Sequence, residues 1–152
     1  MKKLLILIAV VLLMIGCKKE KPIYVFGDRV PVYFSFVDID GNDLLNPSHP
    51  EALLYEFIYL YKLENGEKEL VYDSDMDNPK GMSFLNETIN SEYYRLGIFD
   101  FEGIMILDFG DNNADTISYN KYTGIMIYDG EVVWDYKRDG YRHPIATIVK
   151  NN

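Results

Sequence analysis

Residues 53–72 decide the fold, and they read LLYEFIYLYKLENGEKELVY. Aromatic and apolar side chains fill the first half, which favours a pleated strand although the run is long enough for a helix. Asn65-Gly66 separates it from a second extended run at residues 67–72. Both central residues of a type I′ turn need positive φ, which Asn and Gly tolerate. The stretch therefore predicts a hairpin, with its first strand, residues 53–63, buried on both faces for much of its length.

Shorter strand patterns recur along the rest of the chain. Val32, Phe34 and Phe36 alternate with more polar neighbours, which indicates a half-buried strand. Asp129-Gly130 marks a second two-residue hairpin. Further strands are expected at residues 67–72, 92–101, 104–109, 115–119, 122–128, 131–134 and 145–150. The pattern predicts an all-β, immunoglobulin-like antiparallel β-sandwich of about seven to eight strands, with a barrel as the alternative.

The amino terminus predicts export. Lys2 and Lys3 precede an apolar run at residues 4–15, which is too short to span a bilayer and is typical of a secretory signal. Gly16 and Cys17 end the run in a pattern that resembles a bacterial lipobox. We expect a signal peptide at residues 1–16, a lipidated Cys17 with a tether at residues 17–28, and a β-sandwich domain at residues 29–152. The alternative is an ordinary secretion signal with Cys17 in a structural role.

Charge and cysteine content exclude several classes of function. The formal net charge is −9, and removal of the signal peptide would take away Lys2 and Lys3 and leave the chain more acidic still. Such a field disfavours binding to nucleic acid. Cys17 is the single cysteine, so its lipidation would leave no thiol for a disulfide, a zinc site or a nucleophile.

The residues also carry a family resemblance. Cys17 after its lipobox, residues 34–47 and the turn Tyr128-Asp129-Gly130 are similar to segments of small uncharacterised lipoproteins of Bacteroidota. The resemblance implies an immunoglobulin-like sandwich held by lipid at the outer membrane, facing the periplasm or the cell surface. It implies no activity.

Two short motifs also resemble sequence signals of Bacteroidota. Lys19-Glu20 resembles a truncated surface-export signal of this phylum. Asp115-Thr116-Ile117 resembles its O-glycosylation acceptor, with Thr116 as the acceptor, although a β-branched residue at the start of a strand explains Thr116 equally well.

An acidic loop is the candidate metal site. Asp73, Asp75 and Asp77 recur at every second position and precede Asn78, as oxygen ligands do in the first half of a calcium loop. The bidentate Glu of an EF-hand is missing, because Phe84 stands in its place. Solvated turns are the alternative reading, since Asp and Asn side chains bond their own backbone. A second, weaker calcium candidate comprises Asp38, Asp40, Asn42 and Asp43.

Aromatic side chains are the candidate ligand-binding surface. The chain has thirteen Tyr, eight Phe and one Trp. Trp134 follows the Asp129-Gly130 turn and lies near Tyr136 and Tyr141, so these three residues are predicted to form an exposed site for a glycan or protein partner. Core packing is the alternative for each of them.

Catalytic patterns are weak. His49 and His143 are the only histidines, and neither lies in a nucleophile-elbow or zinc-binding pattern. The expected function is a lipid-anchored, non-enzymatic interaction or accessory module without a required cofactor, bound to the membrane by its lipid and to an unknown protein or glycan. A calcium-dependent or glycan-binding module is the alternative, and a hydrolase comes third.

Overall fold

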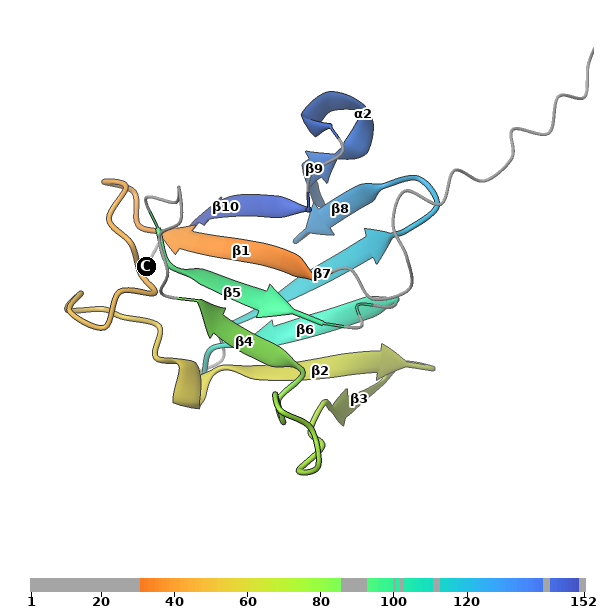
Figure 1. Cartoon of the computed structure of the whole chain (residues 1–152), viewed down its shortest axis with the longest axis horizontal. Helices are drawn as coiled ribbons and strands as arrows, with labels where there is room; N and C mark the ends of the chain where they lie inside the picture. The colour runs from red at the N-terminus through yellow and green to blue at the C-terminus, as the bar shows by residue number, and fades with distance from the viewer. Residues whose placement is uncertain are drawn as a thin grey trace, which may run out of the picture.

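A computed structural model describes residues 31–85, 93–99, 101, 103–110, 113–140 and 143–150 of the 152-residue chain. Two sheets face each other across a shared apolar core, which confirms the predicted all-β sandwich (Figure 1). The smaller sheet has the order β10 (Ile145–Val149), β1 (Val32–Val37), β5 (Arg95–Ile98) and β4 (Met82–Leu85). The larger has the order β3 (Glu67–Leu70), β2 (Tyr59–Glu64), β6 (Ile104–Asp108), β7 (Ala114–Asn120), β8 (Ile125–Tyr128) and β9 (Glu131–Asp135).

The described residues thus form ten strands, more than the seven to eight expected. One of the additions is β4, which lies in a stretch whose mixed composition did not predict a strand. Its inward Met82 is fully buried. Strand pairing is antiparallel except between β1 and β10, where Tyr33 lies opposite Ile145 and Val37 opposite Val149 in parallel register. These two strands are far apart in the sequence, so no hairpin turn imposes an antiparallel arrangement on them.

Both predicted hairpins are confirmed. Asn65 and Gly66 have φ values of 52° and 85°, and Asp129 and Gly130 have values of 46° and 85°. Positive φ at both central residues is the geometry of a type I′ turn, whose twist matches that of the flanking strands.

The predicted long strand at residues 53–63 is only partly correct. A single 3₁₀ turn, η1 (Tyr55–Phe57), precedes β2, so pairing begins at Tyr59. The Lys80 ammonium donates to the carbonyls of Tyr55, Glu56 and Ile58 at 3.1, 2.8 and 3.1 Å. These charge-assisted bonds satisfy carbonyls that would otherwise accept amides from a strand partner. Within β2, Leu60 is buried whereas Tyr59 is exposed, so the strand buries one face rather than two.

The core lies between the sheets and is centred on β1. Val32, Phe34 and Phe36 all point into it, as their alternation predicts. Phe34 lies 5.8 Å from the Tyr128 ring, and Phe36 lies 5.2 Å from the Phe109 ring in a T-shaped contact. Rings from both sheets therefore interlock across the sandwich, in the geometry that aromatic pairs prefer.

The only α-helical segment among the described residues is the single turn α2 (Tyr136–Asp139) after β9. In the part of the chain that the structure describes, no helix has the length and apolar character needed to cross a membrane. The predicted signal peptide and tether, with Cys17, lie outside the described residues.

Candidate ligand-binding cavity

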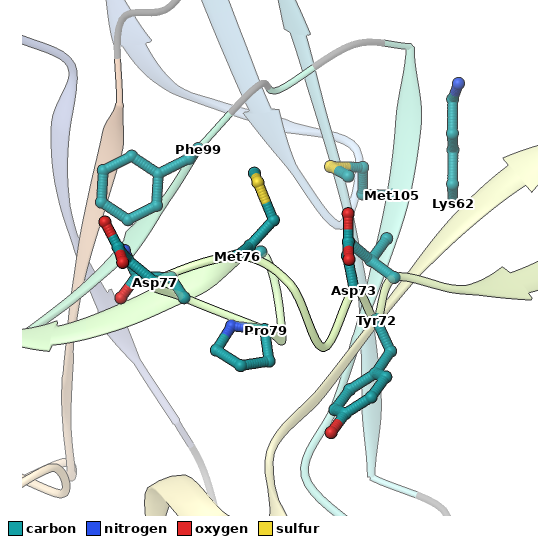
Figure 2. Close-up of a pocket in the computed structure, with 11 residues that line it drawn as sticks. Lys62, Tyr72, Asp73, Met76, Asp77, Pro79, Phe99 and Met105 are labelled. Carbon is teal, nitrogen blue, oxygen red and sulfur yellow. The ribbon is translucent and has the colours of Figure 1, made fainter.

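A cavity of about 520 Å³ opens beneath the loop that joins β3 to β4. Its apolar lining comes from Val71, Met76 and Pro79 of this loop, from Phe99 after β5 and from Met105 of β6. Figure 2 shows the Met76 side chain projecting between Phe99 and Met105. Pockets of this size with mainly apolar walls are typical of small-molecule sites.

The loop is held in shape by its own backbone. The Asp73 amide donates to the Pro79 carbonyl at 2.8 Å, and the Gly81 amide donates to the Asn78 carbonyl at 2.9 Å. Gly81 has a φ of 65°, and a Cβ atom there would lie 2.7 Å from Cγ1 of Val71. Only glycine combines that backbone conformation with so close an approach. Local turns of the loop therefore define this wall of the cavity.

Three of the four predicted calcium ligands, Asp73, Asp77 and Asn78, line this cavity, whereas Asp75 does not. An oxygen of Asp73 accepts the Asp75 amide at 3.0 Å, as in the alternative reading of a self-bonded turn. Among the residues that the structure describes, no group of three or more acidic, His or Cys side chains converges to hold a metal. Calcium binding at this loop stays a prediction.

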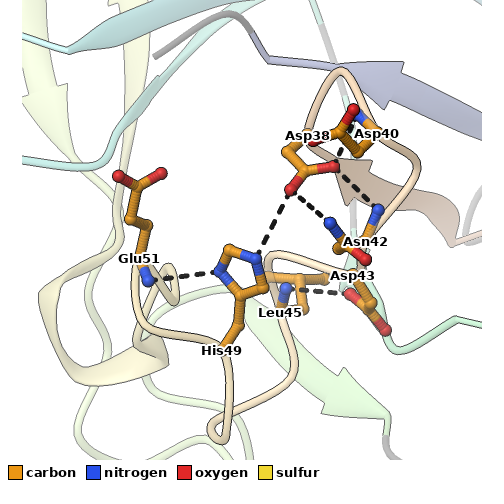
Figure 3. Close-up of polar contacts among 7 residues, drawn as sticks. All are labelled: Asp38, Asp40, Asn42, Asp43, Leu45, His49 and Glu51. Carbon is orange, nitrogen blue, oxygen red and sulfur yellow. Dashed lines mark hydrogen bonds and ion pairs between the residues drawn. The ribbon is translucent and has the colours of Figure 1, made fainter.

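The second acidic loop uses its carboxylates on its own backbone (Figure 3). Asp38 accepts the amides of Asp40 and Asn42 at 2.9 and 2.8 Å. The Asn42 side-chain amide donates to it at 2.7 Å. These bonds, with the Asn42 side chain as the largest contribution, hold the pKa of Asp38 below its usual value. Asp43 bridges further, accepting the Leu45 amide at 2.9 Å and the Tyr94 amide at 2.6 Å.

His49 belongs to the same loop, and its contacts argue against a role as a general base. Its Nδ1 accepts the Glu51 amide at 3.1 Å, so Nε2 carries the proton. Nε2 faces a carboxylate oxygen of Asp38 at 3.5 Å. Both ring nitrogens are therefore engaged within the loop. The arrangement fixes the connection between β1 and η1 and leaves no lone pair for a substrate.

The predicted exposed aromatic site is wrong for Trp134. Only 4% of Trp134 is exposed, and its ring packs 6.4 Å from that of Tyr119 inside the core. The cause is a β-bulge in β9. Ile127 pairs with Val132 and Met126 pairs with Trp134, so Val133 has no partner of its own in β8. The extra residue shifts the alternation along β9, so Val132 points outward and Trp134 inward. Tyr136 is half-buried against the same core, and Tyr141 lies outside the described residues.

The predicted glycosylation motif is divided between two environments. Thr116 is exposed in the middle of β7. Its neighbour Asp115 is buried, accepting from the Lys150 ammonium at 2.5 Å and from the Tyr128 hydroxyl. Burial is the main cause that raises the pKa of the Tyr128 hydroxyl, with the bond to Asp115 second. Modification of Thr116 stays a prediction, with an accessible hydroxyl beside an inaccessible carboxylate.

Two functional features had no clear pattern in the sequence. The apolar lining brings together Met76, Phe99 and Met105 from three separate segments. The Asp115–Lys150 pair joins β7 to the end of β10. Each depends on contacts between segments that lie far apart in the sequence, and no local sequence pattern predicted either of them.

Searches with this chain find no matching family model, no similar curated protein and no similar solved structure. The fold defines the class, an all-β sandwich with two unequal sheets. Any function must be argued from the site itself.

Proposed function

We propose that this protein is a lipid-anchored, non-enzymatic binding module of the bacterial envelope that holds a small, mainly apolar ligand in the cavity beneath residues 71–81. The observation that carries the proposal is the cavity, about 520 Å³ in volume and lined by Met76, Phe99 and Met105. Apolar walls supply affinity, and a few polar groups fix orientation. The signal, the lipobox pattern and the resemblance to Bacteroidota lipoproteins support its place at the outer membrane.

The polar groups at the cavity favour a cationic or hydroxyl group on the ligand. In Figure 2, Asp73 and Asp77 lie on opposite sides of Met76. Lys62 is the cation at the cavity, and it already pairs with Glu64 on the same strand. The two carboxylates thus dominate the local charge, so an ammonium group on an apolar body would be attracted and a carboxylate repelled.

Binding can be tested with the neutral fluorophore N-phenyl-1-naphthylamine, which brightens on entering an apolar site. Met76→Asp is expected to weaken binding at least tenfold, because it places a third carboxylate against the apolar walls. Ile39→Asp is the matched control, since Ile39 is 80% exposed and lies in another loop. Phenethylamine should displace the fluorophore at lower concentration than 3-phenylpropionate. Equal binding of the fluorophore by the Met76→Asp variant and the wild-type protein would refute the site.

The anchor needs its own experiment. Cys17→Ser is expected to move the protein from the membrane fraction to the soluble fraction and to abolish labelling by palmitate, because the acyl chains provide the membrane affinity. A protein that stays with the membrane after this change would contradict lipid anchoring while leaving the cavity untouched.

Calcium is the second candidate ligand, favoured by the presence of Asp73, Asp77 and Asn78 in the lining of the cavity. A site would appear as a rise in melting temperature with millimolar calcium that Asp77→Ala removes, because Asp77 lines the cavity. An unchanged melting temperature in wild-type protein would exclude this candidate.

A further inference from the structure

β10 presents an unprotected edge of the smaller sheet. Among the described strands, β3, β4, β9 and β10 end their sheets. The β3 edge is charged at Glu67, Lys68 and Glu69, and β9 has a carboxylate at each end and a bulge beside it. β10 reads Ile-Ala-Thr-Ile-Val, without a charge, a proline or a glycine. Charges, bulges and prolines are the devices that normally prevent an edge from pairing with another chain.

The backbone of β10 pairs with β1 along one edge, and its other edge has no paired strand among the described residues. The Tyr33 amide donates to the Pro144 carbonyl, and the Lys150 amide donates to the Val37 carbonyl, each at 2.8 Å. Even-numbered residues of this segment therefore bond to β1. Since successive residues of a strand direct their amide and carbonyl groups to opposite sides, those of Ile145, Thr147 and Val149 point away from β1. Among the described strands none pairs with β10 on that side, although β9 lies close to β10 without hydrogen-bonded pairing.

A groove of about 680 Å³ lies along this open side. Thr147 and Val149 of β10 form one wall, and Glu131 and Val133 of β9 form the other. Figure 1 shows β10 between β1 and the β8–β9 hairpin. A strand rises about 3.3 Å per residue, so the five residues of β10 offer a pairing length of roughly 17 Å.

The charge of the groove identifies the occupant. Asp129 and Glu131 contribute carboxylates at the β8–β9 turn. Among the described residues of the lining, Lys150 is the one cation, and Asp115 neutralises it at 2.5 Å. The groove is therefore acidic, and a second copy of this chain, with its own net charge of −9, would be repelled from it.

We propose that this groove binds an extended segment of a partner protein, about five residues long and carrying Lys or Arg, which pairs with the open edge of β10 as an added strand. Main-chain bonds to Ile145, Thr147 and Val149 would supply affinity, and the carboxylates of Asp129 and Glu131 would select the basic side chain. This site is separate from the cavity beneath residues 71–81 and does not depend on the function proposed for it.

The test uses the full-length protein and two fluorescein-labelled heptapeptides of alternating Thr and Val, one with a central Lys and the other with a central Glu. Fluorescence anisotropy should show binding of the Lys peptide, at least tenfold weaker binding of the Glu peptide, and weakening of the Lys complex by salt. Thr147→Pro removes an outward amide while leaving the even-numbered bonds to β1, so it should reduce affinity at least tenfold. Thr147→Ala, which keeps the amide, is the matched control.

Glu131→Lys provides a second variant on an exposed side chain, which keeps the test decisive if the proline variant does not fold. It should weaken the Lys peptide and strengthen the Glu peptide. Undiminished binding by a folded Thr147→Pro protein, the same affinity for both peptides, or no binding of either would overturn the proposal. Concentration-dependent dimerisation that Thr147→Pro abolishes would also overturn it, because the occupant would then be a second copy.

Discussion

Replacing Lys150 by methionine is expected to destabilise the protein by about 3–5 kcal/mol, because it leaves the Asp115 carboxylate buried without its cation. The side chains of Asp115 and Lys150 are each only 10% exposed and lie 2.5 Å apart. The Lys150 ammonium also donates to Asn113 at 2.9 Å and lies 4.3 Å above the Phe109 ring. Methionine preserves most of the apolar stem, so the loss reports mainly on charge and hydrogen bonding.

The same reasoning predicts that the double change costs much less than its parts. Removing both charges with Asp115→Asn and Lys150→Met leaves no uncompensated ion in the interior, so the two single losses should exceed the double loss by about 2 kcal/mol or more. Lys62→Met is the matched control. Lys62 pairs with Glu64, and their side chains are 37% and 51% exposed. Loss of this ion pair should therefore cost under about 1 kcal/mol.

Urea unfolding followed by Trp134 fluorescence measures these differences. Trp134 is the single tryptophan and is buried in the core, so its emission should shift to longer wavelength when the sandwich opens. A loss of 3 kcal/mol would correspond to a fall in melting temperature of roughly 6–12 °C. If Lys150→Met cost no more than Lys62→Met, or if the two single losses simply added, the buried pair would not be an energetic unit.

Three further changes test other contacts. Above pH 10.0, the usual pKa of tyrosine, the unfolded state releases the Tyr128 proton while the folded state keeps it, so stability should fall with rising pH. In urea unfolding across that range, Tyr128→Phe should flatten the fall by up to about 1.4 kcal/mol per pH unit, and an unchanged slope would assign the effect to other groups. Gly81→Ala should cost more than Gly66→Ala by thermal melting, because both have positive φ but only the former meets Val71; equal losses would count against a tight loop. Asp43→Ala should cost about 1–3 kcal/mol in the same assay by leaving the Tyr94 amide without its acceptor, and a loss as small as that of the exposed Asp40→Ala would refute this.

Features governed by neighbouring residues were predictable from the sequence. The turns at Asn65-Gly66 and Asp129-Gly130 follow from the positive φ that those residues tolerate. The inward face of β1 follows from alternation. Both depend on interactions within a few residues of the chain, and both are correct in the structure.

Features governed by distant residues were not predictable. η1 exists where a strand was expected because Lys80, more than twenty positions later, bonds the turn's carbonyls. Trp134 is buried because a bulge shifts the alternation in β9, and a bulge depends on the partner strand rather than on local composition. The cavity was missed for the same reason, since Phe99 and Met105 meet Met76 only after the sheets form.

The unequal width of the two sheets explains why the candidate sites lie where they do. Four strands cannot cover six, so the larger sheet extends beyond the smaller one at its ends. Near the β2–β3 side, the loop of residues 71–81 folds over the uncovered surface and encloses the apolar cavity. At the β8–β9 side nothing comparable covers the surface among the described residues, and the groove beside β10 stays open. At each end, a segment of this chain or a partner can therefore cover the exposed part of the larger sheet. A strand added beside β10 would give the smaller sheet a fifth strand and bring its width closer to that of the larger sheet. This is the structural reason to expect a peptide there.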